Sequence, residues 1–151
     1  MRIFNKLTLS VAAALTLSAT TVVAADLAAA RTTPHGNWAT IDDETGETKS
    51  IVRVYEVEGK LYGVVKQLLL RPGAKCEKCE GDDYMAPIEG MVVVWGLSDA
   101  DGDGTWEGGK VFDPEKNKTY RCKIWMDGGK IKIRGYLGPF FRTQTWVPSN
   151  K

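Results

Sequence analysis

Short runs of apolar and polar residues alternate along most of the chain, and turn-forming residues separate them. Residues 50–57 show partial alternation, Glu58-Gly59 follows, and residues 60–68 resume the pattern, which predicts a β-hairpin. Further strands are predicted at residues 91–95, 106–112, 119–126, 131–137 and 142–147. No segment after residue 26 keeps a helical period over ten residues. About eight or nine strands in hairpin order predict an all-β fold, a single antiparallel up-and-down barrel, because closure removes exposed edges.

The first 25 residues have the order of a secretory signal peptide. Arg2 and Lys6 precede an apolar stretch at residues 7–17, and small residues lead up to Ala25. This stretch of about 11 residues is much shorter than the roughly 20 that span a bilayer. We therefore expect residues 1–25 to be removed, residues 26–35 to form a leader segment and residues 36–151 to form one domain. The predicted location is the periplasm or the exterior, with no membrane span.

The charge balance of the exported part is close to neutral. The chain has 20 basic and 19 acidic residues, and removing Arg2 and Lys6 leaves 18 against 19. No basic run remains, so nucleic acid and anionic membrane surfaces are not predicted as partners.

Gly36-Asn37-Trp38, at the start of the first predicted strand, resembles the first signature of the lipocalin superfamily. In that superfamily the Trp plugs the closed end of the barrel, and an Arg of the last strand packs across its ring. The resemblance gives Trp38 and Arg142 these two structural roles. A guanidinium can stack on an indole while it donates hydrogen bonds to nearby carbonyls.

A wider set of motifs covers nearly the whole exported part in one order. These are Gly36-Asn37-Trp38, Cys76-x-x-Cys79, Pro87-Ile88-x-Gly90, Trp95-Gly96, Trp106-x-Gly108-Gly109, Asp113-Pro114, Tyr120-x-Cys122, Arg134-Gly135-Tyr136 and Arg142-Thr143-Gln144-Thr145-Trp146. The set resembles the exported bacterial family numbered 2147 among domains of unknown function. The resemblance implies export and a lipocalin-like barrel and no particular activity. Pro139-Phe140-Phe141 departs from the family's usual glycine-containing turn.

Three cysteines leave several interpretations open. Cys76 and Cys79 lie in a loop rich in Gly, Asp and Pro, and an oxidising compartment favours a local disulfide between them. A redox pair lacks a βαβ context, and a metal site would need ligands beyond the single histidine, His35. Cys122 alternates with apolar residues, which predicts a buried free thiol; the other interpretation makes it a third partner for the loop.

An acidic loop offers a weak calcium candidate. Asp99, Asp101 and Asp103 stand at alternate positions before a glycine, as in the first half of an EF-hand loop. The twelfth position, however, is Lys110, and no helices are predicted on either side. An ordinary solvated hairpin loop is the favoured interpretation, and no other metal or cofactor is predicted.

Cationic and aromatic residues share strand faces at three places, which suggests a ligand site. The candidates are Arg53, Tyr55, Arg134, Tyr136 and Gln144, with Trp95 or Trp125 nearby. If these side chains point inward, the barrel would bind a small, partly apolar ligand, with an acidic group as one option. If they point outward, they form ordinary solvated faces. The period-two pattern does not decide between the two, because apolar residues occur on both faces.

Two function classes follow. The first is a protein that binds a small molecule in its barrel; the second is a structural or interaction module of the cell envelope, with a filled barrel and loops that touch a partner protein. Catalysis is disfavoured, because the exported part has one histidine and no base–nucleophile pair. No catalytic residue is predicted.

Overall fold

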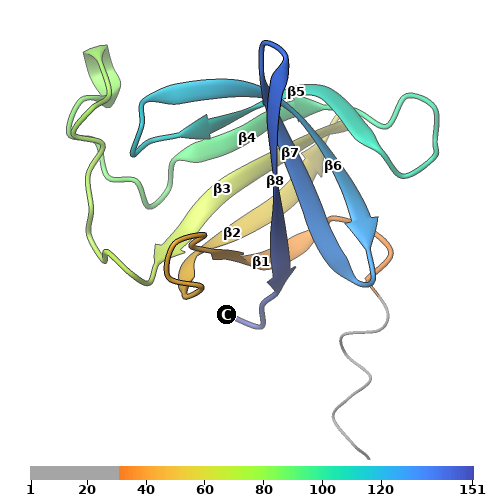
Figure 1. The fold of residues 1–151 in the computed structure, drawn as a ribbon, viewed down its shortest axis with the longest axis horizontal. Coiled ribbons are helices and arrows are strands. Elements are labelled where there is room, and N and C mark those ends of the chain that lie inside the picture. Colours follow the sequence, from red (N-terminus) through yellow and green to blue (C-terminus); the bar gives the residue numbers. More distant parts are fainter. Residues whose placement is uncertain (1–30) are drawn as a thin grey trace, which may run out of the picture.

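A computed structural model describes residues 31–151; the predicted signal peptide and residues 26–30 lie outside this part. Eight strands form a closed barrel in which each pairs antiparallel with the next (Figure 1). The strands are β1 (Gly36–Ile41), β2 (Thr48–Val57), β3 (Lys60–Leu68), β4 (Val92–Leu97), β5 (Trp106–Asp113), β6 (Lys118–Asp127), β7 (Lys130–Leu137) and β8 (Phe140–Pro148). The prediction of one antiparallel up-and-down barrel is confirmed. No helix of the described part is long and apolar enough to cross a membrane.

The tight hairpins come from local backbone chemistry. Between β2 and β3, Glu58 and Gly59 both adopt positive φ, at 50° and 72°, as a two-residue turn between twisted strands requires. The seam between the first and last strands is short, with two aligned residue pairs, the same number as between β4 and β5. β1 and β8 are in register only at Trp38–Pro148 and Ala39–Val147.

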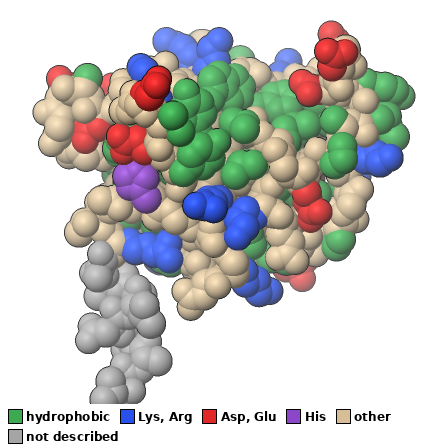
Figure 2. Space-filling model, turned by 180° about the vertical axis from the view of Figure 1, so that it is seen from behind, with side chains coloured by type: hydrophobic (Ala, Val, Ile, Leu, Met, Phe, Trp, Pro, Cys, Tyr) green, Lys and Arg blue, Asp and Glu red, His purple; other side chains and the backbone are tan. Residues whose placement is uncertain are grey.

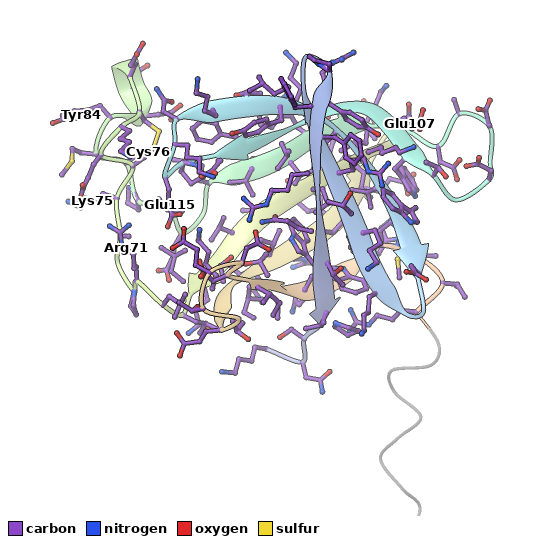
Figure 3. All side chains as sticks on the ribbon, in the orientation of Figure 1. Arg71, Lys75, Cys76, Tyr84, Glu107 and Glu115 are labelled. Carbon is purple, nitrogen blue, oxygen red and sulfur yellow. A yellow bond between two sulfur atoms is a disulfide. The ribbon has the colours of Figure 1, made fainter. Side chains whose placement is uncertain are left out.

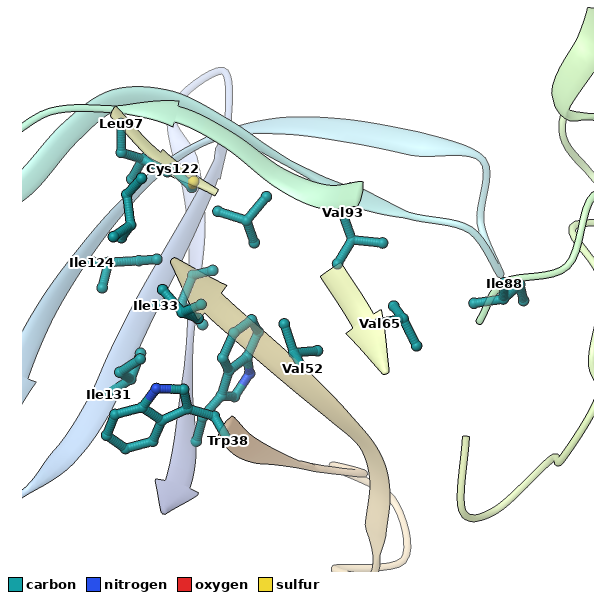
Figure 4. Packing of buried hydrophobic residues seen from close by; sticks show 14 of the residues in the cluster. Trp38, Val52, Val65, Ile88, Val93, Leu97, Cys122, Ile124, Ile131 and Ile133 are labelled. Atoms are coloured by element: carbon teal, nitrogen blue, oxygen red, sulfur yellow. The ribbon is translucent and has the colours of Figure 1, made fainter. Parts of the chain in front are cut away.

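Alternation along the strands sends one set of apolar side chains into the barrel. Trp38, Leu61, Leu97, Ile124 and Ile131 are fully buried there. Figure 4 shows Trp38 and Ile131 at one end of this cluster, whereas Val65, Val93 and Ile88 lie toward the other. The barrel is therefore tightly packed at one end, which we call the closed end.

Trp38 lies fully buried at this end, and the partners of its ring differ from those predicted. Its Nε1–H donates to the carbonyl of Pro34 at 2.7 Å, and the guanidinium of Arg31 lies 5.1 Å from the ring centroid. The backbone favours glycine at position 36, because its φ is +122°; a Cβ there would also lie 2.8 Å from Nη1 of Arg31 and would displace the end of that side chain. The stacking role predicted for Arg142 is wrong. Residues 31–35, which precede β1, supply the contacts to the ring instead.

The cysteine predictions are confirmed. Cys76 and Cys79 form a disulfide, and Cys122 is free and buried on β6. The long connection between β3 and β4 carries the disulfide, and both of its cysteines pack into the hydrophobic core beside Ile88. The backbone N–H of Cys76 donates to the carbonyl of Ala86 at 2.8 Å, which folds this connection back on itself.

Candidate functional site

A cavity of about 610 Å³ occupies the other end of the barrel. It opens between four connections: β1 to β2, β3 to β4, β5 to β6 and β7 to β8. The inner wall is mainly apolar. It comprises Val52, Val65, Leu68, Ala74, Ile88, Val93, Val111, Phe112, Ile133 and Trp146, with Tyr120 and Gly135 among them. A volume in this range suits one small molecule.

Charged residues surround the opening, and its four cations are paired. Lys49 Nζ lies 2.5 Å from Glu115 Oε2, and Arg71 Nη1 lies 3.8 Å from the other oxygen of the same carboxylate. Figure 3 shows Arg71 and Glu115 on the side of the barrel that also carries the disulfide loop. These contacts connect β2, the β3–β4 connection and the β5–β6 turn.

The remaining two cations of the opening are paired as well. Lys116 lies 3.6 Å from Asp113, and Arg142 forms an ion pair with Asp43 of the β1–β2 loop. The same carboxylate of Asp43 accepts a hydrogen bond of 2.8 Å from Gln144 Nε2. Arg142 and Gln144 thus line the cavity as neighbours on the inner face of β8, and the charge of Arg142 is already compensated by Asp43.

Arg53 and Tyr55 point outward, so the ligand-binding role that an inward orientation would have given them is wrong. Val52 and Val54 point inward on β2, so the residue between them and the one after them face outward. Arg53 is exposed, and the ring of Tyr55 stacks on Tyr62 with centroids 5.8 Å apart. Figure 2 shows a group of hydrophobic side chains on the back of the molecule, with several Lys and Arg side chains near it. The Nε2 atom of His35 lies 3.0 Å from Oε2 of Glu56.

The prediction is also wrong for Arg134, Tyr136 and Trp125. Ile133 and Gly135 line the cavity, so their neighbours on β7 face outward. The Arg134 guanidinium lies over the rings of Trp125 and Phe141, at 5.3 and 4.5 Å, and its Nε–H donates to Thr143 at 2.8 Å. These contacts hold the guanidinium on the barrel exterior, and none of them is with an acidic residue.

Trp95 also lies outside the cavity, opposite Lys110 on β5. Gln144 is thus the one predicted ligand-binding residue that the structure places in the cavity wall. Hydrophobic alternation alone could have assigned β7, where Ile131, Ile133 and Gly135 share a face. The cationic residues of that strand drew the interpretation to the wrong side.

Two further residues, Gly135 and Trp146, shape the cavity wall, and the sequence contains a signal for each. Gly135 sits inside a strand, and a Cβ there would make ordinary contacts with Tyr120, at 3.4 Å, and Val111, at 3.8 Å, so the missing side chain leaves room in the cavity. Trp146 shares the inner face of β8 with Gln144 and is 4% exposed. Its Nε1 is the one buried side-chain nitrogen or oxygen of residues 31–151 without a hydrogen-bond partner.

The acidic loop between β4 and β5 is organised by its own backbone. The carboxylate of Asp99 accepts from the N–H groups of Asp103 and Gly104, and Asp103 accepts from Thr105 at 2.7 Å. Glu107, at the start of β5, lies on the side of the barrel away from the disulfide loop (Figure 3). Among the described residues, no three His, Cys, Asp or Glu side chains converge in a way that could hold a metal ion.

The sequence and the fold are both similar to those of known bacterial proteins. The model of a family described as "Uncharacterized protein conserved in bacteria (DUF2147)" matches residues 36–147. The fold is similar to that of HP1028 from the human pathogen Helicobacter pylori, a protein described as belonging to the lipocalin family. That match has a TM-score of 0.66 and 20% identity, and covers 77% of this chain and 83% of the other. No curated protein matches the sequence.

Proposed function

The chain belongs to the DUF2147 family of bacterial proteins, and we propose that it binds a small, largely apolar molecule in the cavity of its lipocalin-like barrel. The observation that carries this proposal is the cavity of about 610 Å³, open at one end and walled by apolar side chains. We further propose that the protein acts in the periplasm after removal of residues 1–25. The signal-peptide pattern and the Cys76–Cys79 disulfide support this location.

The ligand we propose has no net charge. An acidic group was an option only while Arg53 and Arg134 were expected to point inward, and both lie outside. An anionic ligand at the opening would compete with Asp43 for Arg142 and with Glu115 for Lys49. Because each carboxylate is already in place, this exchange gains little.

A neutral oxygen on the ligand has a natural partner at the cavity wall. The Nε1–H of Trp146 is buried without an acceptor, and a buried donor left unsatisfied costs free energy. Nε1 has almost no accessible surface, so a ligand carbonyl or hydroxyl would reach it through a small shift of the ring and would then remove that cost. We therefore propose an apolar molecule that carries at least one uncharged oxygen function.

The alternative of an interaction module requires a barrel filled by its own side chains. The cavity and the missing side chain at Gly135 favour the binding function over this alternative.

Titration with two fluorescent probes tests the proposal. Nile red is neutral and carries a carbonyl, whereas anilinonaphthalene sulfonate has similar apolar rings with a negative charge. We expect the protein to bind Nile red more tightly than the sulfonate. Native mass spectrometry of the protein from its own host should also reveal a co-purifying neutral molecule.

Two matched variants test whether the probe binds inside the cavity. Gly135→Met fills the cavity and should weaken Nile red binding by roughly tenfold or more, as loss of a buried apolar contact implies. Arg53→Met, on the outer face of β2, should leave binding unchanged. Equal affinity of Gly135→Met and the wild type, or no binding of either probe and no co-purifying molecule, would refute the proposal.

A further inference from the structure

The hairpin between β7 and β8 ends in the most exposed apolar group of the barrel. Phe140, Phe141 and Leu137 are 75%, 61% and 53% exposed, and we call these three residues the hairpin tip. The turn between the two strands projects beyond the neighbouring strands (Figure 1). Exposed large apolar side chains are common one at a time, whereas three together on a projecting turn mark a binding surface.

Cations lie beside this tip on the outer face of the barrel. Cross-strand pairing aligns Lys110 of β5 with Arg121 of β6, Arg121 with Tyr136 of β7, and Tyr136 with Phe141 of β8. Inward-facing neighbours Val111, Tyr120 and Gly135 set the outward direction of this row. Arg134 adds a further cation, in contact with the ring of Phe141.

These cations lack acidic partners. Lys110, Arg121 and Arg134 form no ion pair with any residue between 31 and 151. Farther along the same face, Lys123 and Lys132 are faced by Glu107 and Asp127. The nearly neutral overall charge therefore conceals a locally positive surface, which begins at the hairpin tip.

We infer that the hairpin tip and the row behind it dock the protein on a bilayer that contains anionic phospholipid. Apolar side chains enter the boundary between headgroups and acyl chains, whereas Tyr, Lys and Arg prefer the headgroup level. The tip and the row supply these two layers in that order. The uncompensated cations complement the negative charge of the lipid surface.

The size of the patch favours a bilayer over a protein partner. One phenylalanine buries about 150–250 Å², so three partly exposed side chains supply well under the roughly 800 Å² that each partner contributes to a stable protein interface. Insertion into lipid needs no matching surface. Leu137 and Phe140 also line the cavity opening, so docking would bring that opening to the membrane.

Co-sedimentation with vesicles tests the inference. The full chain is expressed, and the N-terminus of the product is determined by mass spectrometry, so that all variants share it. Vesicles contain equal amounts of phosphatidylglycerol and phosphatidylethanolamine, or phosphatidylcholine alone. We expect binding to the anionic vesicles that weakens as salt is added. Phe140→Ser with Phe141→Ser should lower the partition coefficient roughly tenfold or more.

Further variants separate the contribution of the cations from that of the apolar side chains. Arg121→Gln with Arg134→Gln should weaken binding to anionic vesicles and remove most of its salt dependence. Val57→Ser replaces an exposed apolar residue at the β2–β3 turn and should bind as the wild type does. Circular dichroism verifies that each variant is folded. Phe140→Trp gives a direct readout, because brominated lipid should quench a tryptophan placed in the bilayer.

Several results would overturn the inference. They are failure of the wild type to sediment with anionic vesicles, equal sedimentation after the double serine substitution, and conversion of a dimer to a monomer by that substitution. The last outcome would assign the tip to a second copy of the chain. Gly135→Met, which fills the cavity, should dock normally, so failure of the ligand-binding proposal and failure of membrane docking are distinguishable.

Discussion

Replacing Trp38 with alanine should remove a large part of the stability of the barrel. The side chain is 0% exposed, donates a hydrogen bond to Pro34 and lies beneath the guanidinium of Arg31. Truncation of a buried tryptophan costs about 3–5 kcal/mol, because apolar contacts are lost and a cavity remains. Domains are stable by about 5–15 kcal/mol, so the change is large. We expect a midpoint lower by about 10–20 °C, a shift scaled to a domain of this size.

The identity of the partner over the ring can be tested separately. A double-mutant cycle pairs Trp38→Leu with Arg31→Met, and a second cycle pairs Trp38→Leu with Arg142→Met. The first should give a coupling of about 0.5–1 kcal/mol, as a cation–π contact at a partly exposed site does. The second should give about zero, because Arg142 is paired with Asp43 at the opposite end of the barrel.

Urea unfolding followed by far-ultraviolet circular dichroism measures both cycles. A larger coupling with Arg142 than with Arg31 would refute the assignment of Arg31. A loss below about 1 kcal/mol for Trp38→Ala would show that the side chain does not close the barrel.

Three further predictions concern the cysteines and the β1–β2 loop. Burial raises the pKa of Cys122 from 9.0 to about 12. Stability should therefore fall as pH rises from 9 toward 12, because only the unfolded thiol ionises there, and Cys122→Ala should abolish this fall in pH-dependent unfolding. Replacing Cys76 and Cys79 with serine should cost about 1–2 kcal/mol in urea unfolding, because the closed loop is short; a loss above about 4 kcal/mol would contradict this. Hydrogen bonds from the backbone N–H and then the hydroxyl of Thr45 lower the pKa of Asp42 below 3.8, so the stability it contributes is present above that value and lost as the pH falls through the folded pKa. Thr45→Ala removes the hydroxyl and keeps the backbone N–H, so it should raise the Asp42 midpoint in an NMR titration, and an unchanged midpoint would argue against the hydroxyl bond.

The sequence was sufficient to predict the barrel because strand pairing depends on local signals. Glu58-Gly59 and the alternation on both sides of it specify one hairpin, and the same logic extends around the sheet. The disulfide between Cys76 and Cys79 was favoured by the expected oxidising compartment. The hairpins depend on neighbours in the sequence, whereas closure of the barrel, which pairs β1 with β8, was inferred from the need to remove exposed edges.

It was harder to predict from the sequence which face of the Arg-containing strands points into the barrel. On β2, Ile51 is buried on the same alternate set as Arg53, so apolar residues occur on both faces. A register irregularity between Ile51 and Val52 adds to the ambiguity. The partner of Trp38 was missed for another reason. Arg31 precedes the first strand, where no periodic pattern indicates that the chain folds back over the ring.

The short seam between β1 and β8 has a consequence for how the protein reaches its native state. Its two strands are the first and last of the barrel, and they pair at only two positions. When the chain folds from its N-terminus, one edge of β1 therefore stays unpaired until β8 is available. Such long-range pairing is slow to form and leaves the edge open to pairing with other chains. The time that β8 needs to reach and pair with β1 therefore sets how long the partly formed sheet is vulnerable to aggregation.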